Sequence, residues 1–249
     1  MLLLRESFAD RPAYDMAVSA ALLQRVVGGE IAPALRVHRH RPAVAFGRRD
    51  ALLPGYPAAL RAARGHGFTP LERLAGGRAA VYHEGTLEVG EVLADPTGAT
   101  GLRDRFRDNA ELLAEALGSL GVDARIGEVP REYCPGEFSV NARGAVKLAG
   151  SAQRVVRGGA YVGTVVVVHG AARVAAVVRD VYRALEIDVD PETTGAIEDE
   201  VPGVTLSAVE DALVAAYARR FELEPATLDE RTLALAAELE PRFGPPAAG

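Results

Sequence analysis

The sequence contains one cysteine, Cys134, one lysine, Lys147, and no tryptophan among its 249 residues. A single cysteine excludes an internal disulfide and a thiolate metal cluster. The five histidines show no spacing typical of metal ligands, so we predict no metal site. Arginine replaces lysine throughout the rest of the chain, as in proteins from GC-rich genomes, and this bias makes Lys147 conspicuous without proving a role for it.

Strong positive charge and long apolar runs are also missing. The net charge of −6 argues against binding to a nucleic acid polymer. The longest strongly apolar run, residues 161–168, is far too short to span a membrane. The N-terminus, MLLLRESFADRP, lacks the basic start and the apolar stretch of a signal peptide. We therefore expect a cytoplasmic protein that binds no membrane.

Apolar residues make up 49% of the chain and aromatic residues only 6%, so valine, leucine and alanine must fill the core. Segments with the hydrophobic period of a helix and segments with the alternation of a strand follow one another along the chain. This pattern predicts an α+β fold, with mixed β-sheets flanked by helices. Helices are expected at 10–27, 54–65, 104–118, 171–185, 206–221 and 228–239. Strands are expected at 2–4, 34–38, 42–46, 79–83, 86–93, 122–126, 138–140, 145–148, 153–156 and 160–168, with a tight turn at 150–152.

Residues 1–190 are expected to form a catalytic domain, and residues 191–249 to form helices that pack on it or make a small appendage. His38 and His40 alternate with arginines, which predicts an ordinary strand with a basic face. The glutamates at 84, 88 and 91 are expected on a side that faces solvent or a partner.

The segment from Arg73 to His83 contains the pair Gly76-Gly77. Glycines let a backbone approach a ligand closely, and arginines offer forked donors to a carboxylate or a phosphate. The alternative is a hairpin turn with surface arginines. This motif is weak evidence when it stands alone.

Cys134 and Lys147 lie thirteen residues apart, and Pro135-Gly136 places the cysteine in a predicted loop. A thiolate can attack an acyl carbonyl, and a nearby cation can stabilise the thiolate or hold the carbonyl oxygen. The alternatives are a small buried apolar side chain for Cys134 and a surface role for Lys147. His83 and His169 are candidate proton acceptors, although lone histidines are more often structural.

Two segments in this order resemble the biotin/lipoate protein ligase superfamily, on its lipoate–protein ligase A-like side. ERLAGGRAAVYHEGTLEV (72–89) is similar to its glycine-rich motif, and VKLAGSAQRVVRGGAYVGTVVVV (146–168) to its lysine motif and the strand that follows. The resemblance covers roughly residues 1–220. Tyr-Cys-Pro-Gly-Glu-Phe-Ser-Val (133–140) is closest to the cysteine-dependent branch, the octanoyltransferases and the octanoyl/lipoyl amidotransferases.

This resemblance implies a class II synthetase-like catalytic fold and transfer of an octanoyl or lipoyl group, through a cysteine thioester, to the lysine of a lipoyl domain. Cys134 would be the nucleophile, and Lys147 would orient the acyl carbonyl. Arg73, Gly76, Gly77, His83, Gly150, Ser151 and Ala152 would line the substrate pocket. The implied partners are a lipoyl-domain acceptor and an acyl donor, either an acyl-carrier protein or a glycine-cleavage H-type protein.

Transfer would need no cofactor. One alternative is an ATP-dependent lipoate–protein ligase, which would use ATP and Mg. Another is a non-catalytic protein that binds an acyl group or a lipoyl domain. The glycine motif departs from the family pattern, since Ala75 replaces serine, Arg78 replaces the third glycine, and Glu84 replaces aspartate. These changes count against nucleotide binding and favour the transferase.

Overall fold

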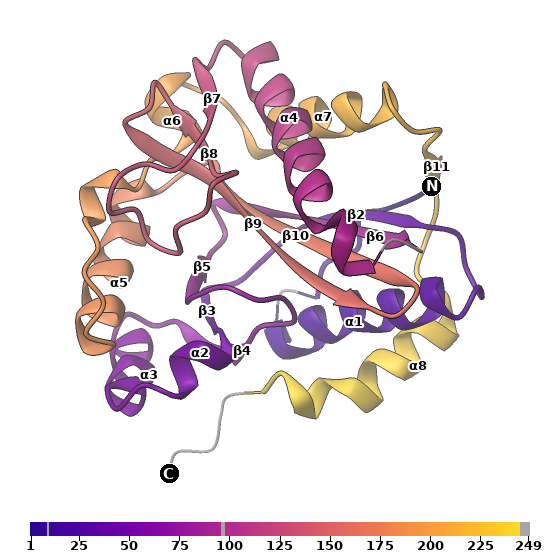
Figure 1. Ribbon diagram of the computed structural model, residues 1–249, viewed down its shortest axis with the longest axis horizontal. Helices are drawn as coiled ribbons and strands as arrows, with labels where there is room; N and C mark the ends of the chain where they lie inside the picture. Colours follow the sequence, from indigo (N-terminus) through magenta and orange to yellow (C-terminus); the bar gives the residue numbers. More distant parts are fainter. Residues whose placement is uncertain (9, 96–97, 245–249) are drawn as a thin grey trace.

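A computed structural model describes residues 1–8, 10–95 and 98–244 (Figure 1). Eight strands form one mixed sheet in which β1 is parallel to both of its neighbours and the other pairs are antiparallel. In spatial order they are β11 (Glu224–Pro225), β1 (Leu2–Leu4), β2 (Ala34–Arg39), β6 (Thr86–Ala94), β10 (Gly159–Val167), β9 (Val146–Val156), β8 (Val140–Ala142) and β7 (Ala124–Ile126). A small sheet holds β4 (Thr69–Glu72), β3 (Ala43–Phe46) and β5 (Ala80–Tyr82).

Helices cover both faces of the large sheet (Figure 1). The helices are α1 (Pro12–Val27), α2 (Arg48–Ala51), α3 (Tyr56–Gly65), α4 (Leu102–Ser119), α5 (Ala171–Ala184), α6 (Ile197–Glu200), α7 (Leu206–Ala218) and α8 (Glu230–Leu239), with 3-10 turns η1 (Gly98–Gly101), η2 (Pro191–Thr193) and η3 (Glu240–Arg242). One face packs on α1 and α8, and the opposite face on α4 and α7. A third apolar cluster lies between the small sheet and the helices α3 and α5. The predicted α+β class with mixed sheets and flanking helices is confirmed.

The helices after residue 190 pack on the rest of the chain. Tyr217 of α7 is buried and its hydroxyl accepts a hydrogen bond from Asn109 of α4. Strand β11 extends the large sheet beside β1, and Ala236 and Leu239 of α8 bury their side chains against α1. We propose that residues 191–244 belong to the same folded unit as the rest of the described chain, and residues 245–249 lie outside the described residues.

Three local expectations differ from the structure. Residues 150–152 form no turn: they lie within the continuous strand β9, where ladder pairing with β10 keeps even Gly150 extended. The short helix α2 was not predicted, since four residues carry too little periodicity to detect. The segment 75–78 connects β4 to β5, but both strands pair with β3, so this turn does not close the hairpin that was one alternative for it.

Candidate active site

A cavity of about 430 Å³ lies between β9, the glycine turn at 75–78 and the loop that precedes β8. Its wall includes the side chains of Arg73, Cys134 and Lys147. Most of the remaining surface is apolar, with contributions from Leu102, Phe106, Phe138 and Val165 among others. This volume is typical of sites that enclose a small apolar ligand next to a few polar groups.

Cys134 reaches this cavity from a strained loop. Its φ of 43° is in the left-handed region, which non-glycine residues adopt rarely and usually at functional positions. The sulfur accepts a hydrogen bond from the backbone N–H of Arg78 at 3.3 Å and a longer one from Nη1 of Arg73 at 3.7 Å. A cation and an N–H group that face the same sulfur stabilise a thiolate, the nucleophilic form of cysteine.

The Arg73 guanidinium is held in place under the glycine turn. Nη1 also donates to the carbonyl oxygen of Arg78 at 2.5 Å. Burial lowers the pKa of Arg73, but the facing sulfur of Cys134 raises it, and the net direction is upward. The guanidinium therefore keeps its positive charge beside the sulfur.

Gly77 is required by the close packing in this turn. Its φ is 98°, and a Cβ atom there would lie 2.9 Å from Nη1 of Arg73 and 3.1 Å from Sγ of Cys134. The neighbouring Gly76 donates its N–H to the carbonyl oxygen of Gln153 at 3.2 Å, which fastens the turn to β9. The glycine pair thus lets the backbone approach the sulfur and the strand together.

Lys147 is buried, with 2% of its surface exposed, although a surface position was one of the expectations. Its Nζ donates to Oε1 of Glu132 at 2.9 Å and to the carbonyl oxygens of Tyr133 at 3.1 Å and Cys134 at 2.8 Å. Lysine has three N–H groups, and all three are used. In this structure Lys147 anchors the loop that carries Cys134.

Gly150, three residues after Lys147 in the second motif, leaves room for the lysine side chain. A Cβ atom at Gly150 would lie 2.7 Å from Cε and 3.0 Å from Nζ of Lys147. The lysine side chain therefore lies across the glycine, and any larger residue there would displace it. Ser151 and Ala152, which follow on β9, also line the cavity.

Eight of the nine predicted site residues line this cavity; His83 is the exception. They are Arg73, Gly76, Gly77, Cys134, Lys147, Gly150, Ser151 and Ala152. His83 is buried in the corner between β5 and β6, where its Nδ1 accepts the N–H of Gly85. Burial and the nearby Arg173 lower its pKa. His169 pairs instead with Glu198 at 2.9 Å. A role for either histidine in the reaction stays a prediction.

Two features of the site were missed in the sequence. Glu132 is fully buried and accepts hydrogen bonds from Lys147, Ser139 and the backbone of Gly136. Its place two residues before Cys134 was a signal, since a buried lysine needs a buried carboxylate. The stacked rings of Phe106 and Phe138, 6.1 Å apart, come from distant segments, and no local pattern brings them together.

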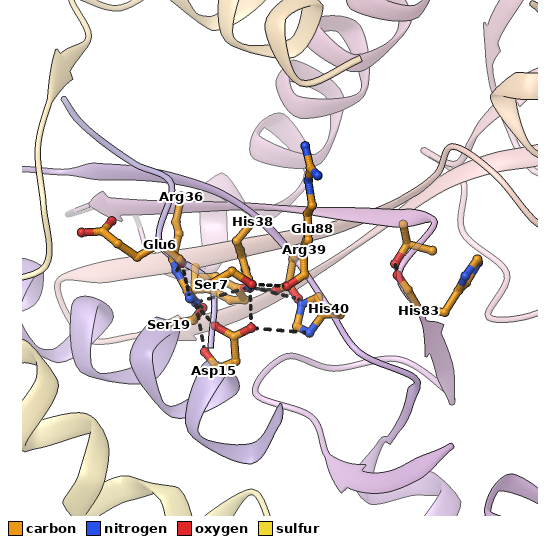
Figure 2. A network of polar contacts seen from close by, with 12 residues as sticks. Glu6, Ser7, Asp15, Ser19, Arg36, His38, Arg39, His40, His83 and Glu88 are labelled. Carbon is orange, nitrogen blue, oxygen red and sulfur yellow. Dashed lines mark hydrogen bonds and ion pairs between the residues drawn. The ribbon is translucent and has the colours of Figure 1, made fainter. Parts of the chain in front are cut away.

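Asp15, His38 and His40 form the one group, among the residues that the structure describes, with the composition and proximity of a metal site. They belong to a buried network with Arg36 and Glu88 (Figure 2). Arg36 forms an ion pair with Asp15, and its Nη1 contacts Nε2 of His38 at 3.3 Å. Arg36 thus places a positive charge where a metal cation would bind, so we interpret this group as a structural ion-pair network.

The strand 34–39 and its continuation alternate as predicted, with Arg39 and Arg41 on the exposed basic face and His38 and His40 buried on the other side. One expectation about charged residues is wrong: Glu84 is exposed, but Glu88 and Glu91 are buried rather than solvated. Glu88 accepts hydrogen bonds from His40 at 2.7 Å and from Tyr161. Burial raises the pKa of Glu88, but these hydrogen bonds together with the charges of His40 and Arg36 outweigh burial, and the net direction is downward.

Comparisons with known proteins place the chain in a family. The family model described as the lipoyl protein ligase A/B catalytic domain matches residues 11–218. An octanoyl-[GcvH]:protein N-octanoyltransferase from Exiguobacterium sibiricum is 33% identical over 225 residues, 85% of this chain and 78% of the relative. The enzyme of the same name from Geobacillus kaustophilus is 30% identical over 204 residues, 80% of this chain and 71% of the relative.

Among solved structures, lipoate-protein ligase A bound with ATP superimposes with a TM-score of 0.79 and 21% identity, over 96% of this chain and 94% of that one. This likeness shows that the two proteins share a fold. The glycine turn, the buried lysine and the loop cysteine thus meet at one cavity in a chain that belongs to the lipoyl protein ligase A/B catalytic domain family.

Proposed function

We propose that this chain transfers an octanoyl or lipoyl group, through a thioester on Cys134, to the lysine of a lipoyl domain. The observation that carries the proposal is the position of the sulfur: Cys134 lies on an apolar cavity and faces both the Arg73 guanidinium and the Arg78 amide. The names of the relatives, which describe octanoyl transfer from GcvH to protein, support the same reaction.

In this reaction the Cys134 thiolate attacks the carbonyl carbon of the donor's acyl group. The bond from that carbon to the donor breaks, and the leaving group takes up a proton. The amine of the acceptor lysine then attacks the thioester, loses a proton and releases the thiolate. A single cavity that holds the acyl chain next to the sulfur provides the proximity that both steps need. Lys147 acts here by holding the cysteine loop, and it contacts an acyl carbonyl only if it gives up one of its three bonds.

The partners in this proposal are a lipoyl-domain acceptor and an acylated donor protein of the GcvH type, and no nucleotide is consumed. A thioester is reactive enough for attack by an amine without ATP. An ATP-dependent ligase is the second candidate, since the fold is shared with a ligase that binds ATP.

The test is intact-mass analysis after incubation with an octanoylated donor protein, with and without ATP. We expect an octanoyl adduct on the wild type without ATP, and none on Cys134→Ser. A serine variant that transfers at the wild-type rate would refute the thioester route. Modification of an acceptor only with ATP and free lipoate would indicate the ligase, and binding of a lipoyl domain without any transfer would indicate a non-catalytic protein.

A further inference from the structure

A second cleft, of about 710 Å³, also borders the glycine turn. It shares Arg73, Gly76, Gly77 and Gln153 with the acyl cavity, so the contact between Gly76 and Gln153 separates the two spaces. A molecule that occupies this cleft therefore lies next to the reactive sulfur. The proposed reaction as described above makes no use of this cleft.

The cleft gathers positive charge that the protein leaves uncompensated. Within residues 1–8, 10–95 and 98–244, eight arginines make no ion pair with a carboxylate: Arg48, Arg49, Arg61, Arg64, Arg73, Arg154, Arg157 and Arg242. Five of these eight line this one cleft, and among the described residues that line it Glu72 is the only acidic one. In a chain of net charge −6, this concentration makes a local positive surface.

The arrangement suits a broad acidic surface better than a small anion. Arg48 and Arg49 lie on α2, Arg154 on β9 and Arg242 on η3, and all four side chains are exposed. Sites for phosphate hold the ion with rigid backbone N–H groups or buried forks. In this cleft the N–H of Gly76 is already bonded to Gln153, and Nη1 of Arg73 to Arg78 and Cys134. Exposed arginines from three separate elements provide instead a flexible rim that can meet carboxylates spread over a protein face.

We propose that this arginine cleft, formed by Arg48, Arg49, Arg154 and Arg242 with Arg73 at the shared wall, docks an acidic face of the acyl-carrying lipoyl protein. This inference rests on the proposed function and names the surface that the partner uses. The cleft would align the partner so that its acylated lysine enters the neighbouring cavity. The local positive field would also speed the encounter with an acidic protein face.

The test compares two triple variants with the same change in charge. Arg48→Glu/Arg154→Glu/Arg242→Glu reverses the cleft, and Arg61→Glu/Arg64→Glu/Arg157→Glu reverses three exposed, ion-pair-free arginines that do not line it. The first measurement is equilibrium binding of an H-type lipoyl protein of net negative charge at about 50 mM and about 300 mM NaCl, because added salt shortens the range of charge interactions. Binding is independent of turnover, so it tests docking even if the proposed reaction fails.

We expect the cleft variant to bind at least about tenfold more weakly at low salt and to lose most of the salt dependence, while the control variant binds like the wild type. The rate of Cys134 acylation by the octanoylated protein should fall in parallel, and the rate with a small uncharged octanoyl thioester should not change. Equal binding by all three proteins would overturn the inference. Loss of ATP binding in the cleft variant, with protein binding intact, would overturn it as well and assign the cleft to a small anion.

Discussion

Glu132 neutralises Lys147 and also organises the loop around Cys134. Its Oε2 accepts a hydrogen bond from the backbone N–H of Val129. Its Oε1 accepts hydrogen bonds from the Ser139 hydroxyl, the Gly136 N–H and Nζ of Lys147. A buried charge pair of this kind adds little net stability but becomes costly when one partner is removed. The pair therefore acts mainly to fix one loop conformation, which sets the position of the sulfur.

Glu132→Gln should leave the Lys147 charge buried and without its carboxylate. We expect the free energy of unfolding, measured in urea, to fall by about 3 kcal/mol. Acylation of Cys134 should also be slower than in the wild type at temperatures where the variant is folded. The control is Glu128→Gln, which changes an exposed glutamate in the same loop and should alter neither measurement. A Glu132→Gln variant with wild-type stability would show that the pair does not hold the loop.

Glu91 is a buried carboxyl group, and burial followed by the charge of Asp108 raises its pKa to about 7. The folded protein therefore holds this proton to higher pH than the unfolded chain, in which the pKa is about 4.3. The resulting stabilisation is complete below that lower value and is lost as pH rises through about 7.

Glu91→Gln should remove this dependence. We expect the variant to gain stability over the wild type between pH 5 and pH 8, by up to about 3 kcal/mol, since one pKa unit corresponds to about 1.4 kcal/mol. Urea unfolding at several pH values measures the difference. Burial lowers the pKa of His38, which opposes the trend in both proteins, so only the difference between them is informative. If the difference in free energy of unfolding between Glu91→Gln and the wild type did not change with pH in this range, the raised pKa of Glu91 would be contradicted.

At the scale of elements, the turn at 75–78 and strand β9 form one unit. The turn contributes the Arg78 amide to the sulfur, and β9 contributes Lys147 and the glycine beneath it. The hydrogen bond from Gly76 to Gln153 joins them. The two sequence motifs therefore meet in space, and each one supplies part of the surface around Cys134.

Gly77→Ala tests this unit, and Gly121 offers a matched control. Both glycines have a φ of 98°, but a Cβ atom at Gly121 would meet nothing within 4 Å. Both alanine variants should lose about 1–2 kcal/mol of stability from backbone strain. Only Gly77→Ala should also slow acylation, by at least about tenfold, because its methyl group displaces Arg73 or the sulfur. Equal acylation rates in the two variants would refute this role of the turn.

At the scale of the whole molecule, Arg25 ties the C-terminal helix to the first helix. It lies near the end of α1 and is almost buried, and it donates to Asp229 and Thr232 at the start of α8, both at 2.5 Å. Asp229 also caps α8 by accepting the N–H of Thr232. The hydrogen bonds from Arg25 and Thr232 lower the pKa of Asp229.

Asp229→Ala should therefore cost more than the loss of a helix cap. Thr205→Ala is the control, since Thr205 caps α7 through Ala208 and makes no comparable tie to α1. We expect the loss of the cap to lower the free energy of unfolding by about 1 kcal/mol in each variant, and Asp229→Ala to lose more because it also removes the link to Arg25. Thermal unfolding of both variants measures this, and equal losses would show that the link to Arg25 contributes nothing to stability.

The sequence by itself determined the α+β class, most element positions and the two motifs, because periodicity, glycines and motif spacing are local properties. It also pointed to Cys134, Lys147 and six further residues of the cavity. It failed where the outcome depends on distant partners. Nothing local shows that His38 and His40 turn inward to Asp15 and Glu88, or that Glu88 and Glu91 are buried.

Only the tertiary structure decided how these residues act. Contacts between segments far apart in the chain bring Lys147 to Glu132 rather than to solvent. They also place the glycine turn against the sulfur of Cys134 rather than in a hairpin. The same contacts decide which arginines remain without a carboxylate. The physical reason is that burial and charge compensation belong to the packed interior and surface. A residue's type fixes what it can do, and its neighbours in space fix what it does.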